Sequence, residues 1–334
     1  MRITRHPVLR RFWYPLMPVR LLADGPKPFR LLGEDIVLWL DGDGRPAALA
    51  DRCCHRTAKL SLGFYDEGGL ACGYHGWRYD RSGRCVKIPQ FVRDAVPEGA
   101  RVPAYRAEER YGYAWVALEQ PIAPIPVVPE ASEPGWRFIE QFHLEWNASP
   151  MRMMENMFDT AHFSFVHKAT FGDPDPVPVI PELEPGEHGF VMRSVVPVKN
   201  NALNQKILGM AQAETVRRNH INWWMPFCRR QRIEYPNGLV HAFVTLTAPI
   251  EDDRFMISQF AIRNDTEADA PAADVIAFDR AVTAEDRLII EATDPWVPIA
   301  DMQAERSMPS DKPGLLMRRM FKELFERHGE PVDV

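Results

Sequence analysis

The stretch DRCCHRTAKLSLG (51–63), followed closely by ACGYHGW (71–77), places thiols and imidazoles in two short segments. Three of the chain's five cysteines and two of its ten histidines lie there. The first segment carries one Cys-x-His pair and the second carries one Cys-x-x-His pair. Each segment can therefore offer one thiolate and one imidazole to a shared metal site. The four candidate ligands are Cys53, His55, Cys72 and His75.

Two kinds of metal site use four ligands of this composition. A structural zinc site ordinarily begins with Cys-x2–4-Cys, and neither segment pairs its ligands in that way. A Rieske [2Fe–2S] cluster needs two cysteines on one iron and two histidines on the other, which two mixed loops supply. We favour the cluster over zinc and over a chance grouping of packed side chains. The other cysteines, Cys54, Cys85 and Cys228, are predicted to be packed thiols, with Cys54 pointing away from the cluster.

Cys53-x-His55-Arg56 and Cys72-x-x-His75-Gly76-Trp77 resemble the signature of Rieske oxygenases. The chain departs from the commonest wording of that signature at Cys54 and at Gly73, where a proline is frequent. Neither position is a ligand. The resemblance implies an all-β Rieske domain followed by a helix-grip (START-like) α+β catalytic domain with an antiparallel sheet.

The pattern of turns and prolines also indicates two domains. The chain has 334 residues and 30 prolines, which is long enough for two domains and favours strands over long helices. Hairpin turns are predicted at DGDG (41–44) and at SerGly (82–83), and the Pro-rich PIAPIPVVPE (121–130) reads as a connector. We predict a Rieske domain over 1–120, a connector over 121–134 and a catalytic domain over 135–334.

The second part mixes helix and strand patterns, which favours the α+β class. A helix is predicted from Ser149-Pro150 to about Lys168, another begins near Thr283, and an amphipathic helix is predicted over 314–329. The strands of this part are predicted at 188–200, 229–236, 239–249 and 254–263. In the last helix, the residues predicted to face the core are Leu316, Met320 and Leu324.

A polar stripe runs through the first of these helices. Asn156, Asp159 and His162 follow one another at intervals of three in an otherwise apolar segment, so a helix would align them on one face. His167 lies five residues after His162, about 140° around an ideal helix. To share a metal, the two histidines need the helix to bulge or to end between them. The alternative is a pair of core histidines that make hydrogen bonds, and the Rieske signature upstream favours the metal site.

Residues 156–167 resemble the Asn-x2-Asp-x2-His-x4-His helix of Rieske oxygenases. The resemblance implies that His162 and His167 bind a mononuclear iron(II), with Asn156 close to the iron or its ligands. It implies that Asp159 accepts a hydrogen bond from His75 of the partner subunit and so bridges cluster and iron in a homotrimer.

The third iron ligand must be a carboxylate. Glu285, Asp286 and Glu291 are the candidates in the last third of the chain. AEDRLIIEA (284–292) resembles the late helix of the family, in which the aspartate after a glutamate is the ligand, and this implies Asp286. The alternative is that Asp286 merely closes the first helical turn after Thr283.

The composition narrows the class of partner. A net charge of −6 and a pI of about 6.0 argue against nucleic-acid binding. The sequence contains no run of about 18 apolar residues, the length that would indicate a membrane span. The basic start lacks a signal-peptide core, so we expect a cytoplasmic location. The chain has no G-x-G-x-x-G fingerprint. We therefore expect NAD(P)H to act only through a separate flavin and iron–sulfur reductase or a ferredoxin.

The predicted function is that of the terminal oxygenase component, which uses O2 in aromatic compound catabolism. Monooxygenation of a small aromatic or heterocyclic compound is favoured, with N- or O-demethylation first. Two segments of the chain are similar to segments of short family members such as methylxanthine, vanillate and dicamba demethylases. They are RCCHRTAKLSLG and PSDKPGLLMRRMFKEL. The alternative is C-hydroxylation or cis-dihydroxylation of a ring, and a distant one is a non-catalytic electron carrier.

NHINWWMPF (219–227) is a candidate wall of the substrate pocket. Its aromatic side chains would offer apolar surface to a ring, although aromatic residues in a strand are as often part of the core. The candidate substrate contacts are Trp223, Trp224 and Phe227.

Overall fold

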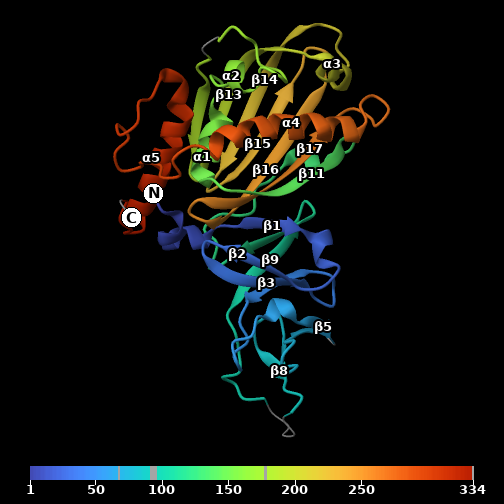
Figure 1. Ribbon diagram of the computed structural model, residues 1–334, viewed down its shortest axis with the longest axis vertical. Helices are drawn as coiled ribbons and strands as arrows, with labels where there is room; N and C mark the ends of the chain where they lie inside the picture. The colour runs from blue at the N-terminus through green and yellow to red at the C-terminus, as the bar shows by residue number, and fades with distance from the viewer. Residues whose placement is uncertain (67, 91–95, 177–178, 333–334) are drawn as a thin grey trace. The chain divides into compact units, whose positions relative to one another are not determined.

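The computed structural model describes residues 1–66, 68–90, 96–176 and 179–332 (Figure 1). The chain divides into two compact units. The smaller unit is Leu9–Ile125 with Ala248–Glu251, and the larger unit is Met1–Val8, Pro126–Thr247 and Asp252–Val334. The first eight residues thus group with the chain from Pro126 onward, and the two units divide inside the Pro-rich segment 121–130.

The smaller unit consists of two antiparallel sheets. One has the strand order β1-β10-β9-β4-β3-β2 and the other β5-β6-β7-β8. The DGDG turn joins β3 to β4 and the SerGly turn joins β7 to β8, so both predicted hairpins are confirmed. The strands are β1 (Tyr14–Pro18), β2 (Lys27–Leu31), β3 (Glu34–Leu40), β4 (Pro46–Ala50), β5 (Phe64–Asp66), β6 (Gly69–Ala71), β7 (Arg78–Tyr79), β8 (Cys85–Lys87), β9 (Ala104–Arg110) and β10 (Tyr113–Ala117).

The larger unit is built on one seven-stranded antiparallel sheet, in the order β11-β17-β16-β15-β14-β13-β12. Helix α4 crosses one face of this sheet (Figure 1). The predicted α+β class with an antiparallel sheet is confirmed. The strands are β11 (Arg137–Trp146), β12 (Glu182–Gly186), β13 (Gly189–Lys199), β14 (Glu214–Trp224), β15 (Cys228–Glu234), β16 (Val240–Glu251) and β17 (Arg254–Arg263).

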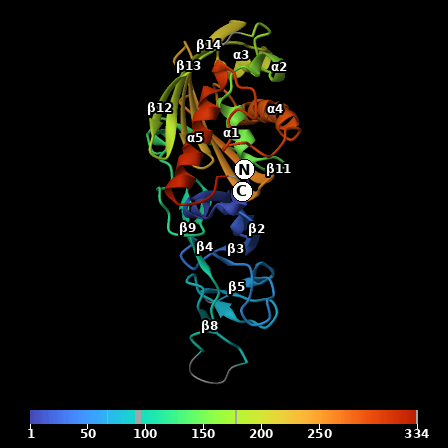
Figure 2. The same ribbon diagram turned by 90° about the vertical axis from the view of Figure 1, so that its left-hand side faces the viewer.

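The helices of the larger unit lie against the sheet and against each other. Helix α5 contacts α1 and β13, and Figure 2 shows it running alongside the sheet. Of its predicted core face, Met320 and Leu324 are buried, while Leu316 is only half-buried. None of the described helices is both long and apolar enough to cross a membrane. The helices are α1 (Pro150–Phe158), α2 (Phe163–Val166), α3 (Ala202–Leu208), α4 (Ala272–Ile290) and α5 (Lys312–Arg327). Short 3-10 helices are η1 (Ile3–Arg5), η2 (Pro7–Arg11), η3 (Val19–Leu22), η4 (Leu60–Leu62), η5 (Pro129–Ala131) and η6 (Pro309–Asp311).

The helix predicted from residue 149 to about residue 168 is wrong in length. α1 ends at Phe158, and Asp159 has an extended backbone. The Asp159 carboxylate accepts the backbone N–H groups of Ala161 at 2.7 Å and His162 at 3.2 Å. A local side-chain bond of this kind competes with the next helical turn, so the chain leaves the helix before the first histidine.

The helix predicted to begin near Thr283 begins at Ala272 instead. Val275 and Phe278 lie in the core of the unit with Ile139 of β11, which gives the extra turns an apolar face to bury. Thr283 lies inside the helix, where its hydroxyl donates to the backbone oxygen of Asp279 at 2.8 Å. Asp286 therefore does not close a first helical turn, and that alternative is excluded.

Candidate metal centres and the cavity beside them

Two loops of the smaller unit have the same backbone plan. In the loop after β4, the backbone N–H of Thr57 donates a hydrogen bond to the backbone oxygen of Cys53 at 3.0 Å. In the loop after β6, the backbone N–H of Gly76 donates to the backbone oxygen of Cys72 at 2.9 Å. Thr57 and Gly76 have φ of 59° and 71°, a region costly for threonine and easy for glycine. Each loop therefore folds tightly around its own Cys–His pair.

The two loops bring the four candidate ligands together. The rings of His55 and His75 lie 4.6 Å apart between centroids. Cys53 and Cys72 are both buried. Burial raises the pKa of the Cys72 thiol, and hydrogen bonds from the backbone N–H groups of Tyr74 and His75 act in the opposite direction. Backbone donors of this kind would stabilise the thiolate form, which is the form that binds a metal ion.

An unpaired ring nitrogen supports a bound group at this place. Nδ1 of His55 is buried and has no hydrogen-bond partner among the described residues. The ring stacks on Trp77 with centroids 4.5 Å apart, which holds it in place. Buried polar atoms are nearly always satisfied, and an iron ion would complete this one. The residues present therefore fit a [2Fe–2S] cluster with two sulfur and two nitrogen ligands.

The other cysteines behave in two ways. Cys85 and Cys228 are buried, as predicted, and burial raises the pKa of their thiols to about 11 and about 12. The prediction that Cys54 is a packed thiol is wrong, because Cys54 is exposed. Its Sγ lies 3.2 Å from the Tyr79 hydroxyl, which also contacts Sγ of Cys53. Because the chain makes a tight turn after Cys53, neighbouring side chains do not alternate as they do in an extended segment, and the thiol of Cys54 reaches the surface.

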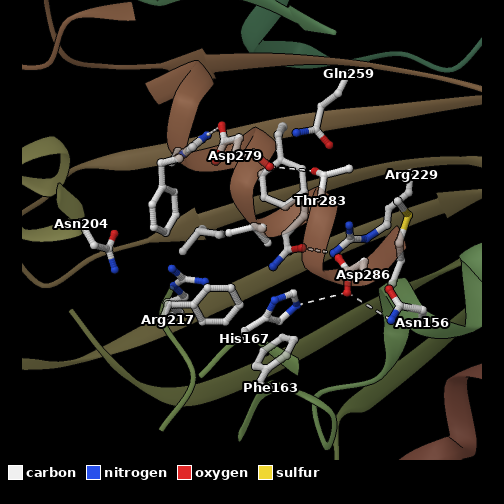
Figure 3. A pocket seen from close by; sticks show the side chains of 18 of the residues that line it. Asn156, Phe163, His167, Asn204, Arg217, Arg229, Gln259, Asp279, Thr283 and Asp286 are labelled. Atoms are coloured by element: carbon white, nitrogen blue, oxygen red, sulfur yellow. Dashed lines mark hydrogen bonds and ion pairs between the residues drawn. The ribbon is translucent and has the colours of Figure 1, made fainter. Parts of the chain in front are cut away.

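In the larger unit, three side chains from two parts of the chain converge. His162 precedes α2, His167 follows it, and Asp286 lies on α4. The Nε2 atoms of the two rings are 3.1 Å apart, and Oδ1 of Asp286 lies 3.5 Å from that of His162 and 3.2 Å from that of His167. The three ligand atoms lie within 4.8 Å of one another, close enough to hold one metal ion. Figure 3 shows His167 and Asp286 side by side.

Carboxylates orient both rings. Nδ1 of His162 lies 3.1 Å from Oδ2 of Asp159, and Nδ1 of His167 lies 2.9 Å from Oε2 of Glu285. These contacts hold the two Nε2 atoms toward each other, as in metal sites whose histidines donate their second nitrogen to a carboxylate. Thr170 donates to Glu285 at 2.8 Å and fixes that side chain in turn.

The three carboxylates considered for the third ligand have different places. Asp286 faces both rings, and Nδ2 of Asn156 donates to its Oδ1 at 3.3 Å. Glu285 lies behind His167. Glu291 is exposed and accepts from the backbone of Asn147 and from Arg287. On α4, Asp286 continues the inward stripe of Val275, Asp279 and Val282 by steps of three and four residues.

The electrostatics of the triad keep its carboxylate ionised. Burial tends to raise the pKa of Asp286, but hydrogen bonds from His162 and His167 lower it to about 2. Burial tends to lower the pKa of His162, but its hydrogen bonds to Asp159 and Asp286 raise it to about 9. Two imidazoles and one carboxylate with open positions are typical of a non-heme iron(II) site. The residues present therefore fit such an ion.

A cavity of about 100 Å³ lies beside the triad. It lies between the sheet and the helices α1 to α4 (Figure 3). Apolar side chains form much of its wall and include Phe163, Phe171 and Phe278. Its polar lining includes Arg217 on β14, Arg229 and Gln231 on β15 and Gln259 on β17. A partly enclosed space with a mostly apolar surface and several polar groups in its wall suits a small ring compound.

The aromatic residues predicted to contact the substrate do not line this cavity, which is a correction. Trp223 is buried between Phe158 of α1, Phe190 of β13 and Phe321 of α5. Phe227 stacks on Phe321 at 5.7 Å between ring centroids. Trp224 lies on the other face of its strand, in a surface hollow beside β12. Trp223 lies on the same face of β14 as Arg217, but the two residues are far apart along the strand. Helices α1 and α5 cover the end of β14 that holds Trp223.

The sequence interpretation missed the polar residues of the cavity. Arg229 and Gln231 alternate with outward residues in CRRQRIE (228–234), which places both on the face that the helices cover. A charged residue on a covered sheet face needs a reason. Arginines stand on both faces of this strand, at Arg229 and at Arg230, so the sequence alone carries no signal that separates the residue at the cavity from its neighbour.

Both halves of the chain match known families. Residues 12–106 match the Rieske [2Fe-2S] domain, and residues 146–327 match the vanillate O-demethylase oxygenase C-terminal domain. The methylxanthine N1-demethylase NdmA of Pseudomonas putida is 32% identical, with 96% of this chain and 91% of NdmA covered. The methylxanthine N3-demethylase NdmB of the same organism is 27% identical, with 95% and 89% covered.

Solved structures give the same result for the fold. NdmA of Pseudomonas putida with caffeine has a TM-score of 0.84 at 30% identity, over 97% of this chain and 93% of NdmA. Dicamba monooxygenase bound to dicamba has a TM-score of 0.82 at 22% identity, over 96% and 98% of the two chains. The second likeness concerns the fold alone.

Proposed function

This chain belongs to the Rieske oxygenases, with a catalytic domain of the vanillate O-demethylase type, and from that membership we propose that it demethylates a small ring compound. It is the oxygenase component of a system that uses O2 and draws electrons from NAD(P)H through a separate reductase. The observation that carries this proposal is the triad of His162, His167 and Asp286 at the wall of a partly enclosed cavity.

We assign the metal ligands as follows. Cys53 and Cys72 hold one iron of the cluster, and His55 and His75 hold the other. The convergence of the two loops and the unpaired Nδ1 of His55 support this assignment. The mononuclear iron is held by His162, His167 and Asp286, an assignment supported by the separations of 3.1 to 3.5 Å between their ligand atoms.

The protein's own groups prepare the reaction at this site. When bound, the cluster supplies electrons one at a time and the iron supplies the site for O2 activation. Asp159 and Glu285 fix the orientation of the histidine rings, and the apolar wall keeps water from the methyl group. The methyl carbon takes one oxygen atom of O2 and the other leaves as water, with two electrons from NAD(P)H. The hydroxymethyl product then loses formaldehyde and leaves an N–H or O–H group.

The subunit arrangement is part of the proposal. Within one chain, Asp159 uses Oδ2 for His162. We propose that it also accepts a hydrogen bond from His75 of the partner subunit, which would join the cluster of one chain to the iron of the next. This arrangement requires a ring of identical chains, and three is the number expected from the family. A cytoplasmic location is also a prediction from the sequence.

Formaldehyde release tests the proposed reaction. Purified oxygenase with a flavin and iron–sulfur reductase, NADH and O2 should release one formaldehyde for each methyl group removed from a substrate in a panel of N-methyl heterocycles and methoxyarenes. A product that keeps all its carbons would instead show ring or side-chain hydroxylation. O2 consumption without any oxidised product across the panel would count against the demethylase function.

Replacing Glu285 by glutamine should weaken iron binding at the second site by about 10- to 100-fold. The amide would lose the charged contact with Nδ1 of His167 and would leave that ring less firmly oriented. The iron retained after dialysis against a graded chelator, counted per cluster, measures the effect. Glu291→Gln is the matched control. Glu291 lies at the end of the same helix, α4, but makes its ion pair with Arg287 and contacts neither histidine. Equal retention by the two variants would contradict the role of Glu285.

A further inference from the structure

Two arginines line the cavity beside the triad. Arg217 of β14 and Arg229 of β15 have only 6% and 5% of their surfaces exposed. Both are among the side chains drawn around the cavity in Figure 3. A buried guanidinium is costly unless a counter-charge or several acceptors surround it. The partners of these two side chains therefore decide whether they serve the fold or a ligand.

The hydrogen-bond and ring partners of both arginines are neutral, although the charge of Asp286 also acts on Arg229. Arg229 donates to the side-chain oxygen of Gln231, and its guanidinium lies 5.3 Å from the centre of the Phe243 ring. Arg217 lies 4.0 Å from the centre of the Phe171 ring and hydrogen-bonds to Tyr235. The Nε atom of each arginine is buried and has no hydrogen-bond partner within the part of the chain that the structure describes.

Other buried arginines of the same sheet are paired with acids. Arg230, the next residue after Arg229, makes an ion pair with buried Glu130. Arg263 on β17 makes an ion pair with Asp265. Where the fold itself needs a buried guanidinium, it thus supplies a carboxylate. Arg217 and Arg229 are the ones that face the cavity, and among the described residues neither has such a partner.

The acids of the cavity wall already have other partners. Asp279 accepts a hydrogen bond from Gln141 and lies 3.4 Å from Nε2 of His241. Asp286 faces His162 and His167. The two acids and the two arginines offset each other in number, and Asp159 and Glu285, which contact the two histidines, would offset the two charges of the iron(II) assigned above. Among the described residues, however, no carboxylate hydrogen-bonds to either of the two guanidinium groups that face the cavity.

We propose that the substrate carries a carboxylate and that Arg217 and Arg229 form the subsite that selects it. The preferred substrate is then a methylated aromatic or heterocyclic acid. The planar fork of a guanidinium matches the two oxygens of a carboxylate, and the unpaired Nε atoms leave donors for it. This inference rests on the proposed function and specifies its substrate class.

Binding of matched acids and amides tests the subsite. The probes are the three methoxybenzoates and 1-methylpyrrole-2-carboxylate, each beside its neutral amide, added to the enzyme with cluster and iron under nitrogen so that no turnover occurs. Calorimetry should give at least one acid a Kd about 30-fold or more below that of its amide. Amides that bind as tightly as their acids throughout, or acids that do not bind at all, would overturn the inference.

Charge-removing variants locate the preference. Arg229→Met and Arg217→Met keep much of the side-chain volume, and at least one should reduce the acid-to-amide ratio to about threefold or less. Arg218→Met is the matched control, because Arg218 is exposed on the opposite face of the same strand as Arg217. A ratio that survives in both cavity variants would overturn the assignment.

The melting temperature without ligand separates a binding role from a structural one. If the two charges await a ligand, Arg229→Met should melt no lower than the unmodified protein. A clearly lower melting temperature together with an unchanged acid preference would make Arg229 structural and contradict the proposal. Formaldehyde from neutral substrates without any acid preference would leave the oxygenase function standing and reject this inference alone. Selective binding of acids without any release of formaldehyde would support the carboxylate subsite and count against the proposed demethylation.

Discussion

Replacing His162 by alanine is expected to lower oxygen-dependent turnover by about a thousandfold or more while the visible absorption of the cluster is unchanged. The variant leaves two of the three assigned iron ligands, so iron binding and its several kcal/mol of electrostatic stabilisation are lost. The cluster ligands lie in the other unit of the chain and keep their loops. Iron content, the rhombic EPR signal of the reduced cluster and turnover measure the three parts of this result.

A second histidine of the same unit provides the control. His220 lies on β14 in a surface hollow away from the cavity. His220→Ala should keep both the iron and the turnover. Turnover that persists in His162→Ala would refute the iron assignment, and loss of the cluster signal in that variant would show that the change acts on the whole fold.

Replacing Asp159 by asparagine should slow electron transfer from the cluster by about 10- to 100-fold, with both metals still bound. The carboxylate holds Nδ1 of His162 at 3.1 Å and the backbone N–H of Ala161 at 2.7 Å. An amide keeps the shape but has only one acceptor oxygen, so it cannot hold its local bonds and also accept from His75 of the partner subunit. The rate of cluster oxidation in a single turnover with substrate and O2 measures the effect.

Asp253→Asn is the matched control for this variant. Asp253 lies exposed at the turn between β16 and β17, and its change removes the same charge elsewhere. An Asp159→Asn protein that oxidises its cluster at the control's rate would contradict the bridge. Loss of iron from the variant would instead show that Asp159 acts only by orienting His162.

The first metal centre was open to prediction because it is local. Cys53 with His55, and Cys72 with His75, each lie within one tight turn, and the turn is closed by hydrogen bonds over four or five residues. Short-range geometry of this kind follows from the order of residues alone. The same holds for the DGDG and SerGly hairpins, whose turn residues set their own backbone.

The second centre was only partly open to prediction, because its proposed ligands come from distant segments. The pattern of residues 156–167 pointed to a metal, although the helix ends before His162. Which carboxylate faces the rings depends on the rotation of α4: one residue turns a helix by about 100°, so Asp286 faces the metal position while Glu285 faces the back of His167. Resemblance suggested Asp286, and no local signal did.

By itself, the sequence determined the two loops, the α+β class and the chemistry of the ligand sets, since these depend on neighbouring residues and on side-chain type. Only the tertiary structure decided which side chains surround the cavity. Trp223 looked suited to a ring substrate but is packed under α1 and α5. Arg217 and Arg229 line the cavity because each strand's alternation and the helices above it place them there. Burial is a property of the whole fold, and it is burial without an acidic partner that turns an ordinary arginine into a candidate anion site.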